Sequence, residues 1–167
     1  MRLMSDSITV KIPKSVLKTL ESEAKRVGLG IEEYIIDLIL READPAERSS
    51  KYIEASRSLL LEAREELSKG NIRQAAEKVW GAAALAIKAH AEAVRGRRLT
   101  SHADLWEYSE VVENDLGSWV YDAWMAANGM HTCFYEGWCT KRKVEEAIKR
   151  VERLVNEIFK VIKEPTH

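Results

Sequence analysis

Alanine dominates the middle of this chain and limits how the chain can fold. Between Asn71 and Arg95, alanine and larger apolar residues occupy several faces of a helix instead of one stripe. A helix that is apolar on several faces lies inside a bundle, with neighbours packed closely around it. Only three prolines and eight glycines interrupt the 167 residues, so most of the chain can be helical. We therefore predict a mainly all-α protein with this segment at its centre.

Capping residues divide the rest of the body into further helices. Asp44, followed by Pro45 and by Glu47 at the third helical position, is a strong helix start. Gly70 ends that helix, and Asn71 is predicted to cap the next one. The later boundaries fall at Ser101, residues 114–117 and Thr140. These signals predict an up-and-down helical bundle with short connections.

The N-terminal residues follow a different pattern. Residues 7–12 alternate polar and β-branched apolar side chains and stop at Pro13, which predicts a short β-strand. Two helices follow, one ending at Gly28 and one starting at Ile31. Since the sequence offers no second strand, we expect the strand to pair with its own copy, in a homodimer or higher homo-oligomer assembled by the strand and the bundle. The predicted domains are an N-terminal module and a bundle, over residues 1–44 and 45–167.

The strand, the two helices and the glycine turn between them resemble a ribbon-helix-helix module over residues 6–43. The resemblance implies that two chains form a ribbon whose outward residues read the DNA major groove. Here those residues are Ser7, Thr9 and Lys11. However, Glu32 and Glu33 open the second helix, and two carboxylates at this position repel a phosphate. We therefore expect dimerisation to be the main role of this module and DNA binding to be weak.

Polar and aromatic side chains of the bundle concentrate in residues 128–138. Asn128, His131 and Tyr135 are spaced by three and four residues, which places them on one face of a helix. Such a patch either pairs with itself or lines a pocket for a ligand that carries a phosphate or a base. For a pocket, the predicted ligand-binding residues are Asn128, His131, Tyr135, Glu136 and Trp138, with positive charge from Arg95, Arg97 and Arg98.

Several motifs between about residues 48 and 163 resemble the archaeal PaREP-type family. They are Lys69-Gly70-Asn71, the run from Ala75 to Trp80, Ser101-His102-Ala103-Asp104-Leu105, and His131 followed by Phe134, Tyr135 and Glu136. That family is similar in turn to HEPN domains, so the resemblance implies a HEPN-like bundle. Active HEPN domains are metal-independent RNases, often toxins, with an Arg-x(4–6)-His motif at a dimer interface. The resemblance makes His131 the candidate catalytic residue.

This chain lacks the arginine of that motif. Counting back from His131, four to six intervening residues lead to Ala126, Met125 or Trp124. None of these side chains can stabilise charge on a phosphorane. General acid–base catalysis alone typically gives only about 10²–10⁴-fold. We therefore expect binding without efficient cleavage.

Cysteine count and charge set further limits. Cys133 and Cys139 are the only cysteines, and we expect them to be reduced thiols. Their spacing does not match the close pairs of structural zinc sites, so we predict no metal site and no cofactor. The net charge of -1 indicates no global attraction to nucleic acid or membranes. No apolar run approaches about 18 residues, and the N-terminal residues lack the apolar core of a signal peptide, so we expect a cytoplasmic protein with no membrane partner.

Three functions from different classes follow. The first is a non-catalytic HEPN-like homo-oligomer that binds a nucleotide, RNA or a protein partner such as an antitoxin, in a toxin–antitoxin or mobile-element context. The second is a metal-independent RNase that uses His131. The third is a DNA-binding transcriptional regulator of the ribbon-helix-helix kind. A nucleotidyltransferase gene next to this one would favour the first two functions over the third.

Overall fold

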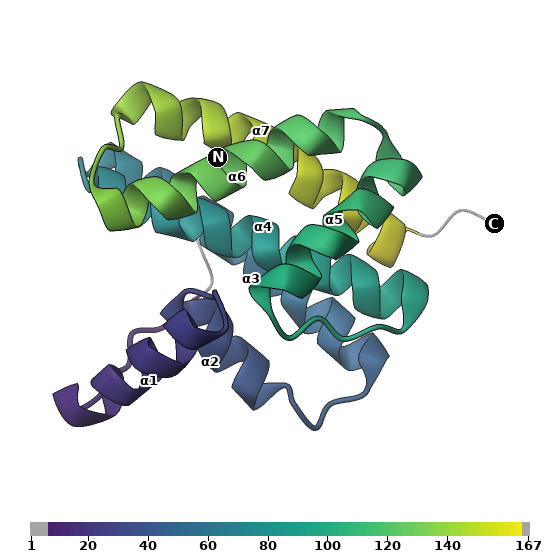
Figure 1. The fold of residues 1–167 in the computed structure, drawn as a ribbon, viewed down its shortest axis with the longest axis horizontal. Coiled ribbons are helices and arrows are strands. Elements are labelled where there is room, and N and C mark those ends of the chain that lie inside the picture. Colours follow the sequence, from purple (N-terminus) through teal and green to yellow (C-terminus); the bar gives the residue numbers. More distant parts are fainter. Residues whose placement is uncertain (1–6, 165–167) are drawn as a thin grey trace.

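The computed structural model describes residues 7–164 as a set of packed helices (Figure 1). In chain order they are α1 (Lys14–Arg26), α2 (Ile31–Ile39), α3 (Pro45–Ser68), α4 (Ile72–Arg95), α5 (His102–Leu116), α6 (Trp119–Glu136) and α7 (Lys141–Lys163). Helices α3, α4, α6 and α7 form the body, and α5 packs against α4 and α6. Helices α1 and α2, called the helix pair below, lie at one edge of the body, where α2 contacts α4 (Figure 1). The predicted mainly all-α fold with a helical bundle is confirmed.

Helix α4 is central, as its alanine content predicts. It contacts α2, α3, α5, α6 and α7. Residues 82–87 are completely buried. The hydroxyl of Ser56 donates to the Ala82 carbonyl at 2.5 Å, and that of Ser49 donates to the Ala89 carbonyl at 3.0 Å. Small side chains therefore line the contact between α3 and α4, and the buried hydroxyls there are hydrogen-bonded.

Most helix starts form where the sequence predicts them. The side chains of Asp44, Ser101 and Thr140 each accept a hydrogen bond from the backbone N–H three residues later, at 2.9, 3.1 and 3.3 Å. These bonds satisfy N–H groups that the first helical turn leaves free. The predicted cap at Asn71 is wrong, because its side chain instead donates to Glu66 Oε2 at 2.7 Å.

The predicted N-terminal β-strand is wrong. Residues 7–13 have no regular secondary structure, and the described part of the chain contains no strand. A strand is held by hydrogen bonds to a neighbouring strand, and residues 7–164 offer this segment no such neighbour. Ile8 and Val10, predicted to lie on the buried face of the strand, are 89% and 69% exposed.

The residues predicted to read DNA lie in this irregular segment. Ser7, Thr9 and Lys11 are exposed, but they do not share one face of a ribbon. The ribbon-helix-helix description is therefore wrong in its strand, although the two helices that follow are formed. Residues 1–6 of the predicted module lie outside the described residues. The homo-oligomer stays a prediction, and comparing the mass in solution of chains with and without residues 1–13 tests it.

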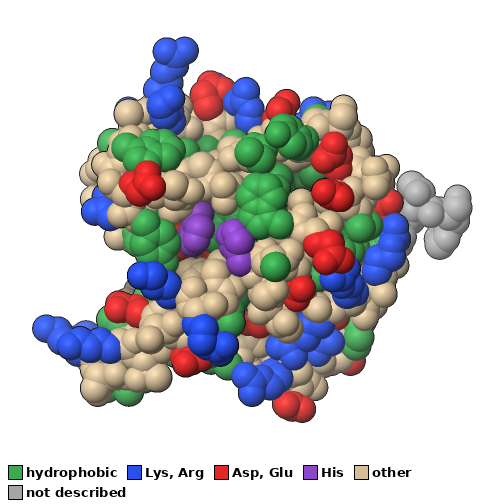
Figure 2. All heavy atoms as spheres, in the orientation of Figure 1, with side chains coloured by type: hydrophobic (Ala, Val, Ile, Leu, Met, Phe, Trp, Pro, Cys, Tyr) green, Lys and Arg blue, Asp and Glu red, His purple; other side chains and the backbone are tan. Residues whose placement is uncertain are grey.

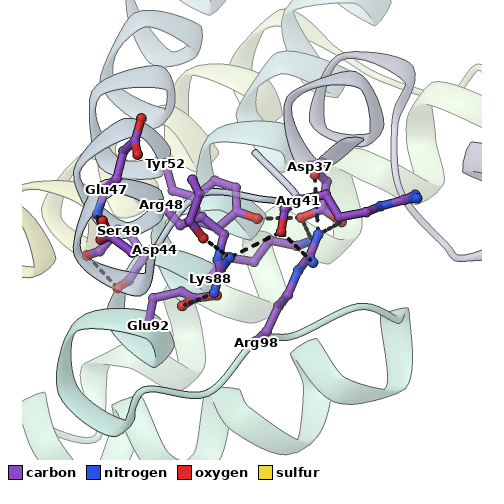
Figure 3. Close-up of polar contacts among 12 residues, drawn as sticks. Asp37, Arg41, Asp44, Glu47, Arg48, Ser49, Tyr52, Lys88, Glu92 and Arg98 are labelled. Atoms are coloured by element: carbon purple, nitrogen blue, oxygen red, sulfur yellow. Dashed lines mark hydrogen bonds and ion pairs between the residues drawn. The ribbon is translucent and has the colours of Figure 1, made fainter. Parts of the chain in front are cut away.

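A buried polar network holds α2 against the body (Figure 3). Oδ1 of Asp37 accepts hydrogen bonds from Lys88 Nζ at 3.0 Å and from the Tyr52 hydroxyl at 2.5 Å. The Arg98 side chain donates to the Asp37 carbonyl at 3.3 Å. Burial lowers the pKa of Lys88, although the Asp37 carboxylate opposes this shift. Because separating the partners would leave a charge buried alone, the network fixes the helix pair in place.

Helix α7 closes the body with one apolar face. This face is buried against α3, α4 and α6, through Val144, Ile148, Val151, Val155 and Ile158. The other faces carry most of the lysines and arginines of this helix. Among residues 7–164, no helix combines the length and the apolar character needed to cross a membrane.

Candidate functional site

The C-terminal half of α6 lies between two regions of opposite charge. Gly137, at φ 79°, ends this helix in the left-handed conformation that favours glycine. His131 and Tyr135 lie on the side of α4 and the helix pair. Met130 and Trp138 line the other region, together with the start of α7. Residues 128–138 therefore contribute to two sites and not to the single site that the sequence predicts.

Aromatic rings surround His131. Its ring stacks on Trp80 with 4.8 Å between centroids, and Tyr135 lies edge-on at 5.2 Å, as the four-residue spacing predicts. The His102 ring is 6.0 Å away. Figure 2 shows histidine side chains among hydrophobic ones above the helix pair. The polar neighbour of His131 is Glu77, whose Oε2 lies 3.4 Å from Nδ1.

Burial acts against the charged form of both partners of this polar contact. Burial lowers the pKa of His131, which favours the uncharged imidazole. Burial also raises the pKa of Glu77 to about 8, and the nearby charge of Glu32 adds to the rise. Burial therefore acts against the ion pair and favours a hydrogen bond in this contact. Among the described side chains that contact His131, none supplies the positive charge that RNA cleavage needs.

His102 has a structural role that the sequence does not reveal. Its Nδ1 lies 3.2 Å from the Gly28 carbonyl, and its Nε2 accepts from the Trp106 indole N–H at 2.8 Å. These two bonds require a neutral ring with the proton on Nδ1. A Cβ atom on Gly28 would overlap the His102 side chain, so this glycine allows α5 to approach the end of α1. His102 thus joins α5 to the helix pair and leaves no nitrogen free for catalysis.

A pocket of about 320 Å³ lies beside His131, between the helix pair and the body. Apolar walls come from the helix pair, α3 and α6, through Ala24, Leu29, Ile31, Leu59, Phe134 and Tyr135. Its charged lining is mainly acidic and consists of Glu21, Lys25, Glu32, Glu33, Glu77 and Lys78. We call this site the acidic pocket.

Glu33 is the most unusual residue of the acidic pocket. It is only 1% exposed, and its Oε1 has no hydrogen-bond partner among the described residues. Burial raises the pKa of Glu33 to about 7, the charge of Glu77 adds to this rise, and the backbone N–H groups of Gly30 and Glu33 partly offset it. From the sequence alone, Glu33 lies in the first turn of a helix, where side chains are usually exposed. It is buried only because the helix pair docks on the body.

Two predicted ligand-binding residues bond to each other instead of facing His131. The Trp138 indole N–H donates to Glu136 Oε2 at 2.6 Å, and both side chains are exposed. Asn128 is half-buried, and its carbonyl accepts from the Thr132 hydroxyl at 3.1 Å. Of the predicted set, the structure brings together only His131 and Tyr135.

The predicted basic loop is engaged elsewhere. Arg95 pairs with Asp115, Arg97 with Glu107, and Arg98 with the Asp37 network. Along α4, the distance from Trp80, which stacks on His131, to Arg95 is about 22 Å at 1.5 Å per residue. The loop therefore neutralises acidic side chains at the far end of α4 and supplies no charge to His131.

The second region beside α6 is a groove of about 830 Å³. Trp138, which is 43% exposed, lies in its lining with three cations of α7, Arg142, Lys143 and Arg150. Its one acidic residue is Glu146, which pairs with Arg150 at 2.9 Å. Within the described chain, the side chains of Arg142 and Lys143 form no ion pair, so their charge is available. We call this site the basic groove.

The two cysteines form a disulfide bond, so the prediction of free thiols is wrong. The turn after Gly137 folds back and brings Cys139 to Cys133 inside α6. This bond fixes the segment that carries Trp138. Both sulfur atoms are thereby removed as metal ligands, and residues 7–164 contain no group of three or more His, Cys, Asp or Glu side chains placed to hold a metal ion.

Comparison with known proteins supports the resemblance seen in the sequence. The model of the archaeal PaREP1/PaREP8 family matches residues 51–155, which include Glu77, His131 and Trp138. The helix pair lies outside the matched stretch, so Glu33 belongs to a part of the chain that the family model does not cover. Comparisons with curated proteins and with solved structures gave no match. Because the matched stretch exceeds half of the 167 residues, the chain belongs to the archaeal PaREP1/PaREP8 family.

Proposed function

We propose that this protein binds single-stranded RNA in the basic groove without cleaving it. The observation that supports this proposal is an exposed tryptophan beside three cations in one groove. Proteins that bind single strands combine a positive channel for the backbone with aromatic rings on which bases stack. Free nucleotides carry the same two groups, a base and a phosphate, and should bind to the same groove with lower affinity.

Charge and geometry favour an anion on this side of α6. Arg142 and Lys143 lie in the first turn of α7, whose free N–H groups also attract negative charge. The indole N–H of Trp138 is occupied by Glu136, so the group that Trp138 offers to a base is its ring. Stacking of a base on such a ring contributes about 1–3 kcal/mol.

Binding without cleavage agrees with the surroundings of His131. This residue lies on the other side of α6, beside the acidic pocket, where the exposed carboxylates of Glu21 and Glu32 would repel a phosphate. It also lacks the arginine that the HEPN motif places before the histidine. The HEPN-like character and the toxin–antitoxin setting remain part of this proposal. They are tested by the identity of the neighbouring gene and by purification with its product.

The proposal is tested by fluorescence anisotropy with a labelled oligouridine. Trp138→Ala should weaken binding about tenfold to a hundredfold because one stacking interaction is lost. The double variant Arg142→Ala/Lys143→Ala should weaken binding further by removing two phosphate contacts. Lys18→Ala/Lys51→Ala is the matched control, since it removes two exposed lysines of α1 and α3 that do not line the groove.

Two results would contradict the proposal. Equal RNA affinity of the groove variants and the control would show that the groove is not the binding site. Metal-independent cleavage of mixed RNA in EDTA that disappears in His131→Ala would show that the protein is an RNase.

A further inference from the structure

The acidic pocket combines features that a purely structural site does not need. One carboxyl oxygen of Glu33 is buried without a partner among the described residues, although Glu33 lines an open space of about 320 Å³. Burying a polar atom without a hydrogen bond is costly, whether the carboxyl is ionised or protonated. A ligand that donates a hydrogen bond to this oxygen would remove that cost.

Two carboxyl groups converge at this point. A Cβ atom on Gly30 would overlap both Glu33 Oε2 and Glu77 Oε1, so both oxygens lie against this glycine. A Cβ atom on Gly81 would lie 3.1 Å from the Glu33 carboxyl carbon. Gly30, just before α2, and Gly81, in α4, therefore leave room for the pair. The pair comes from α2 and α4, which are far apart in sequence.

Among residues 7–164, no lysine or arginine forms an ion pair with Glu33 or Glu77. Lys78 lines the pocket, but its Nζ is bonded to Glu32 at 2.8 Å and to Glu62 at 3.3 Å. Lys25 also lines the pocket and is exposed, and it forms no ion pair with Glu33 or Glu77 in the described chain. The polar end of the pocket is thus formed by two carboxyl groups, and at least one of their oxygens, Glu33 Oε1, is available to accept a hydrogen bond.

We propose that the acidic pocket binds a small organic cation, an alkyl ammonium ion whose head donates hydrogen bonds to Glu33 and Glu77. The ammonium group has three N–H donors and no acceptor, which matches the converging carboxyl oxygens. Its alkyl part lies against the apolar walls formed by Leu29, Leu59 and Phe134. The ring of Tyr135, which is half exposed, lines the pocket and can contact the cation through its π-electrons.

The size of the pocket limits the ligand. A volume of about 320 Å³ is at the lower end of the range of small-molecule sites. The exposed carboxylates of Glu21 and Glu32 also line the pocket, and they exclude free phosphates and carboxylates by repulsion. This site is separate from the basic groove, and its ligand has the opposite charge.

Three probes with the same alkyl body and different heads test the proposal by isothermal titration calorimetry. Pentylamine should bind saturably, pentan-1-ol should bind at least about tenfold more weakly, and pentanoate should not bind. Equal binding of pentylamine and pentan-1-ol, or binding of pentanoate, would overturn the proposal. Absence of saturable pentylamine binding at millimolar concentration would also overturn it.

Variants assign the binding to the two carboxyl groups. Glu33→Gln and Glu77→Gln keep the shape of the side chain but cannot ionise to pair with the ammonium group, and each should weaken pentylamine binding about tenfold to a hundredfold. Glu62→Gln is the matched control, because Glu62 is a half-buried glutamate near the pocket that pairs with Lys78 but does not line the pocket. Circular dichroism establishes that each variant is folded. If folded Glu33→Gln and Glu77→Gln bind pentylamine as tightly as the control does, the proposed site is wrong.

Discussion

The acidic pocket and the basic groove share α6 but differ in how their charges meet the solvent. In the pocket, Glu33 is almost completely buried and depends on the docking of the helix pair. In the groove, Arg142 and Lys143 are exposed and extend from a helix whose apolar face is packed independently of them. Buried charges reduce the stability of the fold, whereas solvated charges change it little. Changes in the pocket should therefore alter folding as well as binding, and changes in the groove should alter binding alone.

The largest expected contrast is between the tryptophans on the two sides of α6. Trp80 has no exposed surface and packs against Trp124, His102 and His131. Trp80→Ala should lower the free energy of unfolding by about 3–5 kcal/mol. Trp138→Ala should change it by less than about 0.5 kcal/mol, since Trp138 is an exposed residue outside the core. Urea denaturation of both variants measures the difference, and equal losses would show that Trp138 also belongs to the core.

The second-largest expected effect is the pH dependence of stability, which comes from the carboxyl groups of the acidic pocket. The groups that face the pocket are Glu21 and Lys25 of α1, Glu32 and Glu33 of α2, Glu77 and Lys78 of α4, and Tyr135 of α6, with His131 beside them. Folding raises the pKa of Glu33 from 4.5 to about 7, so between these pH values the folded state keeps a proton that the unfolded state has lost. The free energy of unfolding therefore falls as pH rises through this range. Glu77 extends the fall to about pH 8.

A neutral replacement should remove part of this fall. Glu33→Gln should be more stable than the original chain at pH 8, by on the order of 3 kcal/mol, and similar to it near pH 4. Glu146→Gln in the groove is the control, and it should gain no stability at pH 8, because ion pairs with Arg150 and Lys149 lower the pKa of Glu146. Urea denaturation at both pH values measures these changes. No gain in Glu33→Gln would mean that the Glu33 carboxyl is hydrated.

Local signals in the sequence predict the body of the fold well. The caps at Asp44, Ser101 and Thr140 depend on residues a few positions apart, and the central place of α4 follows from its own composition. The length of α4 also places Arg95 far from the residues near the start of this helix. The sequence itself therefore argues against the prediction that the loop at Arg95 supplies charge to His131.

The features that the sequence does not predict depend on contacts between distant segments. Glu33 is buried only because the helix pair docks on α4, and Cys139 reaches Cys133 only because the chain turns back after Gly137. The alternation in residues 7–12 correctly describes a segment with strand propensity, but a strand also needs a neighbour. Periodicity therefore could not predict the acidic pocket, since its buried carboxyl groups, Glu33 and Glu77, come from different helices.

Breaking the disulfide should have a smaller effect on stability than the pH change, and it should separate the two sites. Closing so short a loop contributes about 2 kcal/mol in the chain-entropy description. Cys139→Ser should release the segment that carries Trp138 and weaken RNA binding, while pentylamine binding in the pocket should remain. Urea denaturation and the two binding assays measure these effects. A parallel loss of both ligands would show that the bond supports the whole end of α6.

Raising the salt concentration should change the pentylamine affinity of the pocket least and should clearly lower the RNA affinity of the groove. RNA binding should weaken linearly on a logarithmic scale as salt rises, because each phosphate contact releases counterions. Arg142→Ala/Lys143→Ala should reduce that slope by roughly 1 to 2, while Lys18→Ala/Lys51→Ala should leave it almost unchanged. Pentylamine affinity should depend much less on salt, because ions screen a buried pair such as Glu33 and ammonium only weakly. Titrations of both ligands between low and moderate salt make the comparison direct. If pentylamine affinity fell as steeply as RNA affinity, the Glu33 and Glu77 carboxyl groups would have to be in contact with bulk solvent, contrary to their burial between α2 and α4.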